Sequence, residues 1–195
     1  MGITKLSKVG FTSASYQKYD DFLAGNEAFS PSSYESIASN SPTSGNSITF
    51  NSIAGTYASL QIRMFGFDNG AGGRFAMQFN SDTGTNYTRH VLSGSGSTVG
   101  AAGNTLRSFC QLSSFYSNPS STYGYGIITD IHDYASSTKY KTVRTLSGQD
   151  LNGSGEITMY SNLWLNTNAI TSITISTDGT FSSGTTISLY GIKGA

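Results

Sequence analysis

The segment Leu60-Gln-Ile-Arg-Met-Phe-Gly-Phe-Asp-Asn-Gly-Ala-Gly-Gly-Arg-Phe-Ala-Met-Gln-Phe79 sets the pattern for most of this chain. Apolar and polar side chains alternate in Leu60–Met64, and a similar spacing of large apolar side chains returns in Phe75–Phe79. A period of two residues places the apolar side chains on one face of a strand. Because Asp68–Gly73 is rich in the turn formers Gly, Asn and Asp, we expect the two strands to form a hairpin.

Similar alternation continues along the rest of the chain, and no segment has the 3.6-residue period of an amphipathic helix. About nine short strands separated by Gly, Asn, Asp and Ser clusters are typical of an all-β fold. We therefore expect an antiparallel β-sandwich of the jelly-roll or immunoglobulin-like kind rather than a barrel. The further expected strands are Asn86 to Leu92, Leu106 to Leu112, Tyr125 to Tyr134, Tyr140 to Leu146, Glu156 to Leu165, Ile170 to Ser176 and Thr185 to Ile192.

The composition excludes several classes of protein. The 195 residues fit one domain, and 11 basic residues balance 11 acidic ones. A neutral chain has no electrostatic drive toward nucleic acid. No apolar run approaches the roughly 20 residues that a bilayer requires, and no secretory signal is recognised, so we expect a protein that is made in the cytosol and binds no membrane. The single Cys110 allows no internal disulfide and no Cys-based zinc site.

The first 33 residues have a different pattern. Their large side chains follow neither strand nor helix periodicity, which favours an extended N-terminal arm that attaches to another surface. We expect residues 1–33 to form this attachment arm and residues 34–195 to form the sandwich domain. The candidate attachment residues are Phe11, Tyr16, Tyr19, Phe22, Leu23 and Phe29.

Two polar clusters are candidate metal or catalytic sites. Asp130 and His132 would share a strand face, but the set is incomplete and structural hydrogen bonding is the favoured interpretation. Asp150, Asn152 and Glu156 have a spacing reminiscent of the start of a calcium loop, but the remaining carboxylates are missing and an Asn-Gly turn between two strands is the favoured interpretation. The residues alone leave calcium binding open.

Aromatic residues and long loops are candidate contact sites. Trp164 could stack on a sugar or pack in the core, and core packing is favoured. The loops Ser113 to Tyr125 and Gly94 to Asn104 are long for a compact β-domain, so we expect them to form the outward surface. The candidate outer-surface contacts in the first loop are Tyr116, Tyr123 and Tyr125.

Several segments resemble a family of small structural proteins from tailed bacteriophages. The most specific are the strand Tyr57-Ala-Ser-Leu-Gln-Ile-Arg63 and the ending Leu189-Tyr-Gly-Ile-Lys-Gly-Ala195. The resemblance implies a jelly-roll virion component on the particle exterior, a tail-fibre subunit or a capsid decoration protein, and it implies a homotrimer. Other matching segments are Lys18 to Asn26, Tyr34 to Ile37, Phe50 to Ile53, Phe79 to Tyr87, Asp130 to Ala135 and Lys139 to Arg144.

The expected function is therefore a non-enzymatic virion structural protein, anchored to other virion proteins by its N-terminal arm. No nucleophile motif or facing pair of carboxylates supports an enzyme, and no cofactor is expected. A carbohydrate-binding β-sandwich that recognises a host surface glycan is the alternative, although a lectin would not need the arm.

Overall fold

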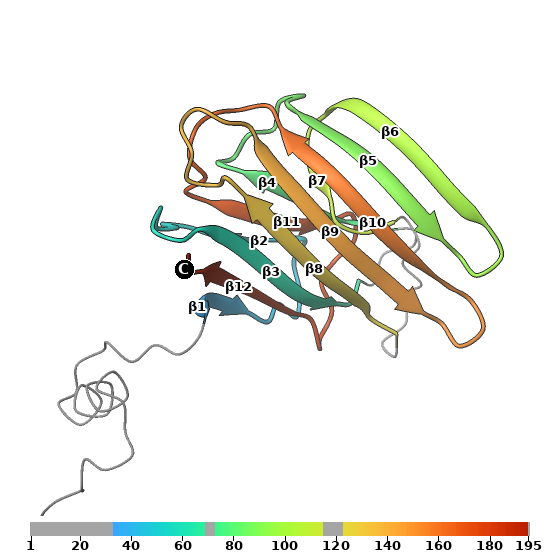
Figure 1. Cartoon of the computed structure of the whole chain (residues 1–195). Coiled ribbons are helices and arrows are strands. Elements are labelled where there is room, and N and C mark those ends of the chain that lie inside the picture. Colours follow the sequence, from blue (N-terminus) through green and yellow to red (C-terminus); the bar gives the residue numbers. More distant parts are fainter. Residues whose placement is uncertain (1–32, 69–72, 115–122, 195) are drawn as a thin grey trace, which may run out of the picture. The chain divides into compact units, whose positions relative to one another are not determined.

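The structure is a computed structural model that describes residues 33–68, 73–114 and 123–194 (Figure 1). The chain divides into two units, Met1–Ser33 and Tyr34–Ala195, and the second is described below. It consists of two antiparallel sheets, so the prediction of an all-β protein with sandwich-like sheets is confirmed. The candidate attachment residues of the arm lie outside the described residues and stay a prediction.

The described residues form twelve strands, where the sequence had indicated about nine. The strands are β1 (Tyr34–Asn40), β2 (Ser47–Phe50), β3 (Ser59–Gly66), β4 (Phe75–Phe79), β5 (Tyr87–Gly94), β6 (Val99–Arg107), β7 (Cys110–Gln111), β8 (Tyr125–His132), β9 (Lys141–Asp150), β10 (Gly155–Trp164), β11 (Ile173–Thr177) and β12 (Thr186–Ile192).

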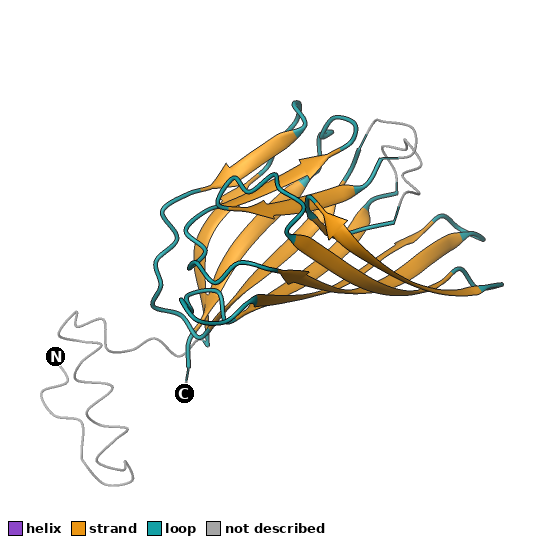
Figure 2. Cartoon of the chain, turned by 90° about the horizontal axis from the view of Figure 1, so that it is seen from above, coloured by secondary structure: helices purple, strands orange, loops and turns teal. Residues whose placement is uncertain are grey.

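The two sheets differ in width. The larger has eight strands in the order β1-β12-β3-β8-β9-β10-β5-β6, and the smaller has four in the order β2-β11-β4-β7. Two hairpins, β5–β6 and β9–β10, belong entirely to the larger sheet and form its last four strands. Figure 2 shows the ends of these hairpins projecting beyond the four-stranded sheet.

The core lies between the two sheets. Leu60, Ile62 and Met64 are buried as their alternation predicts, and they face the buried Phe75–Phe79 segment of the smaller sheet. Full burial of one such side chain contributes about 1.5–3 kcal/mol to folding. Cys110 is also fully buried and behaves as a small core residue; burial raises the pKa of its thiol.

The hairpin predicted for Leu60–Phe79 is wrong. Strand β3 pairs with β8 and β12, whereas β4 pairs with β11 and β7 in the other sheet. The connection therefore crosses from one sheet to the other. Asp68 secures the crossing, because its carboxylate accepts hydrogen bonds from the Thr177 hydroxyl and the Gly179 backbone N–H, and its backbone bridges to Phe181.

The expected strand Leu106 to Leu112 is divided between the end of β6 and the short β7, and the expected loop Gly94 to Asn104 is wrong. Residues Val99–Arg107 form strand β6, which pairs with β5 from Gly94 back to Tyr87. The turn is confined to Ser95–Thr98, where the Ser95 N–H donates to the Thr98 carbonyl at 3.0 Å. This strand is poor in β-branched and aromatic side chains, so pairing with its neighbour decides its conformation rather than intrinsic propensity.

One partly exposed hydrogen-bonded cluster fixes the β4–β5 connection to β10. The indole N–H of Trp164 donates to Asp82 Oδ2 at 2.7 Å, and Asn86 Nδ2 and the Gly84 N–H donate to the same carboxylate. Burial raises the pKa of Asp82, but these hydrogen bonds outweigh it, and the net shift is downward. The ionised carboxylate therefore stabilises the folded state.

We predict that Asp82→Asn lowers the unfolding free energy by about 1–2 kcal/mol at pH 7, because an amide accepts these hydrogen bonds less strongly. A lowered folded-state pKa means that the wild-type advantage exists above the ordinary aspartate range and disappears as pH falls through the lowered pKa. Urea titrations at several pH values, followed by the fluorescence of the single tryptophan, Trp164, measure this difference in unfolding free energy. Asp150→Asn at an exposed turn is the matched control, and a gap between variant and wild type that widens below pH 4 contradicts the prediction.

A second anchor is a buried lysine. The side chain of Lys141 is inaccessible to solvent, and its Nζ donates to the carbonyl oxygens of Ser136, Lys139 and Thr167 at 2.6, 2.8 and 2.7 Å. Burial lowers the pKa of this ammonium group. The lysine joins the β8–β9 connection to the β10–β11 connection, because three otherwise unsatisfied carbonyl groups converge on it.

We predict that Lys141→Met destabilises the protein by about 3 kcal/mol or more, since the three carbonyl groups lose their donor in a buried site. For a domain of this size the melting temperature should fall by roughly 2–4 °C per kcal/mol. Lys139→Met is the control, because Lys139 is exposed and forms only a surface ion pair with Asp133, at 3.1 Å. Equal melting temperatures for the two variants would contradict the assignment.

Candidate interaction surface

The face of the eight-stranded sheet that is turned away from the smaller sheet, called the outer face below, carries exposed apolar side chains in register. Figure 1 looks onto this face, where β8, β9, β10, β5 and β6 lie side by side. Directly opposed residues form one row that crosses all five strands. The row consists of Ile128, Leu146, Met159, Leu92 and Ala101.

A second row lies one pair further along the strands. It consists of Phe65, Gly126, Gly148, Ile157, Gly94 and Val99. Val99 is 82% exposed, and Phe65 and Ile157 are each about half exposed. We call the two rows together the apolar face. Since soluble monomers rarely expose large side chains in one contiguous patch, this face is a candidate interaction surface.

The opposite, buried face of the same strands contains a group of polar side chains beside its apolar core residues. Thr129 and Thr145 share a hydrogen bond at 2.9 Å, and Ser147 and Thr158 share another at 2.8 Å. Burial raises the pKa of Tyr160, on the same face, to about 12. The usual arrangement of an antiparallel sheet, apolar inside and polar outside, is therefore reversed in this part of the sheet.

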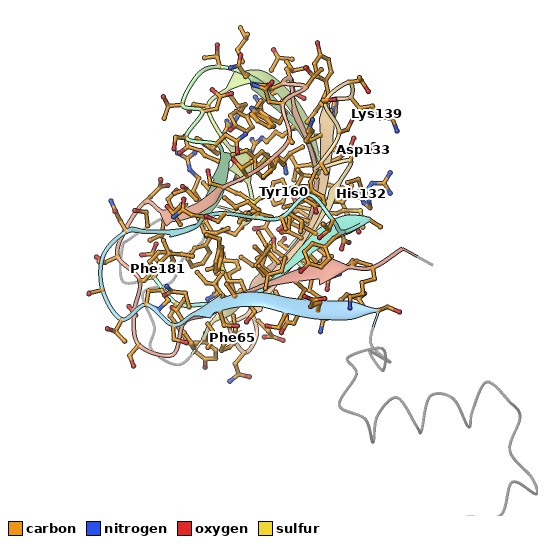
Figure 3. The ribbon with its side chains drawn as sticks, turned by 90° about the vertical axis from the view of Figure 1, so that its left-hand side faces the viewer. Phe65, His132, Asp133, Lys139, Tyr160 and Phe181 are labelled. Carbon is orange, nitrogen blue, oxygen red and sulfur yellow. The ribbon has the colours of Figure 1, made fainter. Side chains whose placement is uncertain are left out.

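The apolar face is hollowed. A depression of about 1060 Å³ opens on it. Phe65, Ile128, Leu146, Ile157 and the glycines between them line it, and the charged Arg63, Asp150 and Glu156 also contribute to its lining. Gly126 contributes open space, because a Cβ added there would meet nothing within 4 Å. Figure 3 labels Phe65 near one end of the molecule and Lys139 near the other. The depression therefore lies toward the Phe65 end.

A polar row borders the apolar face. Asp130 lies opposite Arg144 in this row, and Asp130 Oδ1 accepts a hydrogen bond from Gln61 Nε2 at 2.7 Å. The candidate pair Asp130 and His132 shares the outer face, as predicted, but Asp130 is engaged in this structural hydrogen bond. The described residues contain no group of three or more His, Cys, Asp or Glu side chains that could hold a metal ion.

The calcium-loop hypothesis is not supported by the geometry. Asp150 and Gly155 are directly opposed, as are Gln149 and Glu156, so Asp150 and Glu156 point to opposite faces of the sheet. Asp150 Oδ1 accepts a hydrogen bond from the Asn152 N–H at 2.8 Å. Asn152 and Gly153 have positive φ angles of 57° and 107°, which confirms the alternative interpretation as an Asn-Gly turn.

We predict that calcium has no effect on stability, because the three oxygen-bearing side chains do not converge. The melting temperature in about 5 mM calcium should equal the melting temperature in excess chelator. This concentration exceeds the dissociation constants of weak extracellular calcium sites. A calcium-dependent rise that disappears in Glu156→Gln but persists in Asp130→Asn would contradict the turn interpretation.

The predicted aromatic contacts lie in different environments. Tyr125 is only 3% exposed and packs edge-on against Phe75, so its prediction as an outer-surface contact is wrong. Its place at the start of an inward-facing alternation explains the error. Trp164 is fully buried against Phe79 and Tyr87, which confirms core packing and removes it as a sugar platform. Tyr123 is half-buried, and Tyr116 lies outside the described residues.

Sequence reasoning missed the apolar face. A signal was present in Glu156 to Leu165, where Ile157 and Met159 alternate with Thr158 and Tyr160, but both sets suit a buried face.

Comparison with protein-family models finds no matching family, and neither curated proteins nor solved structures provide a match. Among the described residues, no helix is long and apolar enough to span a membrane.

Proposed function

We propose that this protein is a non-enzymatic structural protein of a tailed-bacteriophage virion, which acts as a homotrimeric subunit on the particle exterior. The observation that carries the proposal is the apolar face, whose side chains are exposed among the described residues. A subunit built for assembly covers such a face in the assembled state. The assignment to a virion and to a trimer rests on the sequence resemblance.

The strand order supports the jelly-roll form of the sandwich. Without the hairpins β5–β6 and β9–β10, the sheets read β1-β12-β3-β8 and β2-β11-β4-β7. Successive framework strands then change sheets at every step except from β4 to β7, which are neighbours in one sheet, and the first and last strands are neighbours, as in a jelly roll. The two hairpins are additions that widen one sheet, and they carry most of the apolar face.

The role of an N-terminal attachment arm belongs to the same proposal. The first described strand, β1, begins at Tyr34, directly after the segment assigned to the arm. The sandwich has its own core in the described residues from Phe50 to Leu189. We therefore expect it to fold without residues 1–33 and to lose its attachment to other virion proteins.

Deletion of residues 2–30 tests this role. The shortened protein should remain soluble and β-rich by circular dichroism, and it should be missing from purified particles analysed by mass spectrometry. A matched control replaces Ser13 and Ser15 by Ala in the full-length chain and should still be incorporated. Incorporation of the deletion variant at the wild-type level would contradict attachment through the arm.

Location in the particle tests the broader proposal. A density map of the intact particle should contain the two-sheet domain on the exterior, as a tail appendage or on the capsid surface. Purified particles that lack the chain altogether would contradict a virion role.

The carbohydrate-binding alternative is weakened, because Trp164 and Tyr125 are both buried and cannot stack on a sugar.

A further inference from the structure

We infer that the apolar face is the surface through which copies of this chain pack against one another, with the outer faces turned toward a common axis. The inference deepens the proposed function, because it rests on the self-association assumed there and identifies the surface. The occupant is a second copy of the chain, and three properties of the face support this assignment.

The first property is the amount of apolar surface. The apolar face exposes Phe65, Leu92, Val99, Ile128, Leu146, Ile157 and Met159, each between 46% and 82%. Side chains of this size at such exposure present several hundred Å², which approaches the about 800 Å² that each partner contributes to a stable interface. The smaller Ala101 and the row glycines add to it. One face therefore suffices for a specific contact between copies.

The second property is charge. Arg63 lies opposite Ile128 at the β3 end of the first row and is charged, whereas the named members of both apolar rows carry no charge. Most of the apolar face can therefore meet an identical face without repulsion. The bordering polar row holds both signs, because Asp130 lies directly opposite Arg144. In a trimer, Asp130 of one copy can lie near Arg144 of the next, and the same contact repeats around the three-fold axis. A face with both signs at its border is suited to bind itself.

The third property is shape. In the second row, Gly126 and Gly148 separate the protruding Phe65 and Ile157. The depression of about 1060 Å³ includes these glycines. A large side chain of one copy can enter the depression of the next, so the face offers both the protrusion and the hollow that receives it. Complementary packing of this kind excludes water from the contact.

Two lysine substitutions on the same strand test the inference. Met159 and Ser161 both lie exposed on the outer face of β10, but Met159 belongs to the apolar row and Ser161 to the polar border. Met159→Lys should weaken self-association at least about tenfold in sedimentation equilibrium, because it buries a charge at the centre of the contact. Ser161→Lys should weaken it by less than about threefold, since a border lysine can reach water.

Cysteine labelling supplies a readout that does not depend on a disruptive substitution. Cys110 is buried, so an added cysteine dominates the reaction with a maleimide. In the full-length protein at a concentration where it self-associates, Met159→Cys should react at least about tenfold more slowly than Ser161→Cys, and dilution should remove the difference. Circular dichroism and melting temperature confirm that each variant is folded.

The outcomes separate the two proposals. Equal effects of the two lysines, or equally fast labelling of both cysteines in the oligomer, would overturn the inference and leave self-association through another surface. A monomeric wild-type protein at micromolar concentration would overturn the inference and the trimer. Slow labelling of Met159→Cys in a monomer would mean that another segment of this chain covers the face, which also overturns it. Incorporation into particles tests the virion role separately.

Discussion

Unequal sheet widths are the constraint on which the rest of this structure depends. A strand has two faces, and a sandwich buries the inner face of a sheet only where another sheet lies opposite. Here four strands oppose eight. Near β3 and β12 the inner face is filled by aliphatic and aromatic side chains, as in an ordinary core. Toward β9 and β10 the inner face changes to hydroxyl and amide side chains that bond one another.

This change in chemistry explains why the outer face is apolar at the same place. Polar groups of the inner layer bond one another. The Gln111 backbone N–H donates to Asn162 Oδ1, and Asn162 Nδ2 donates to the Gln111 carbonyl oxygen, both at 3.2 Å. Such a network specifies position but buries little apolar surface. The strands of the two hairpins can gain further hydrophobic stabilisation when the apolar side chains of their outer face are buried. The two hairpins therefore contribute to the domain by hydrogen bonding and present their apolar side chains on the outer face.

The sequence was sufficient for the fold class and for most strands, because alternation in segments such as Leu60–Met64 reports directly which side is buried. It was insufficient for the pairing of strands. Nothing in Asp68–Gly73 distinguishes a tight turn from a crossing between sheets, since the decisive contacts of Asp68 involve Thr177 and Gly179, far along the chain. Strand β6 was missed for a related reason, because its partner decides its conformation.

The candidate surface was harder to predict than the fold. Alternation identifies two faces of a strand but does not say which one meets the rest of the domain when both are plausible, as for Ile157 and Tyr160. Tyr125 was misassigned because its loop context suggested exposure, whereas its register with Gly66 turns it inward. The turn at Asn152 was predictable, since local backbone preference alone determines it.

Strand β6 has a consequence for the behaviour of the chain before it is assembled. It ends the larger sheet, so within the described residues it has a hydrogen-bonded neighbour on one side only. From Val99 to Leu106 it carries no charged side chain and no proline, the features that usually prevent an edge strand from pairing with other chains. The local chemistry of this edge therefore leaves two copies free to pair edge to edge, which extends a sheet without closing it.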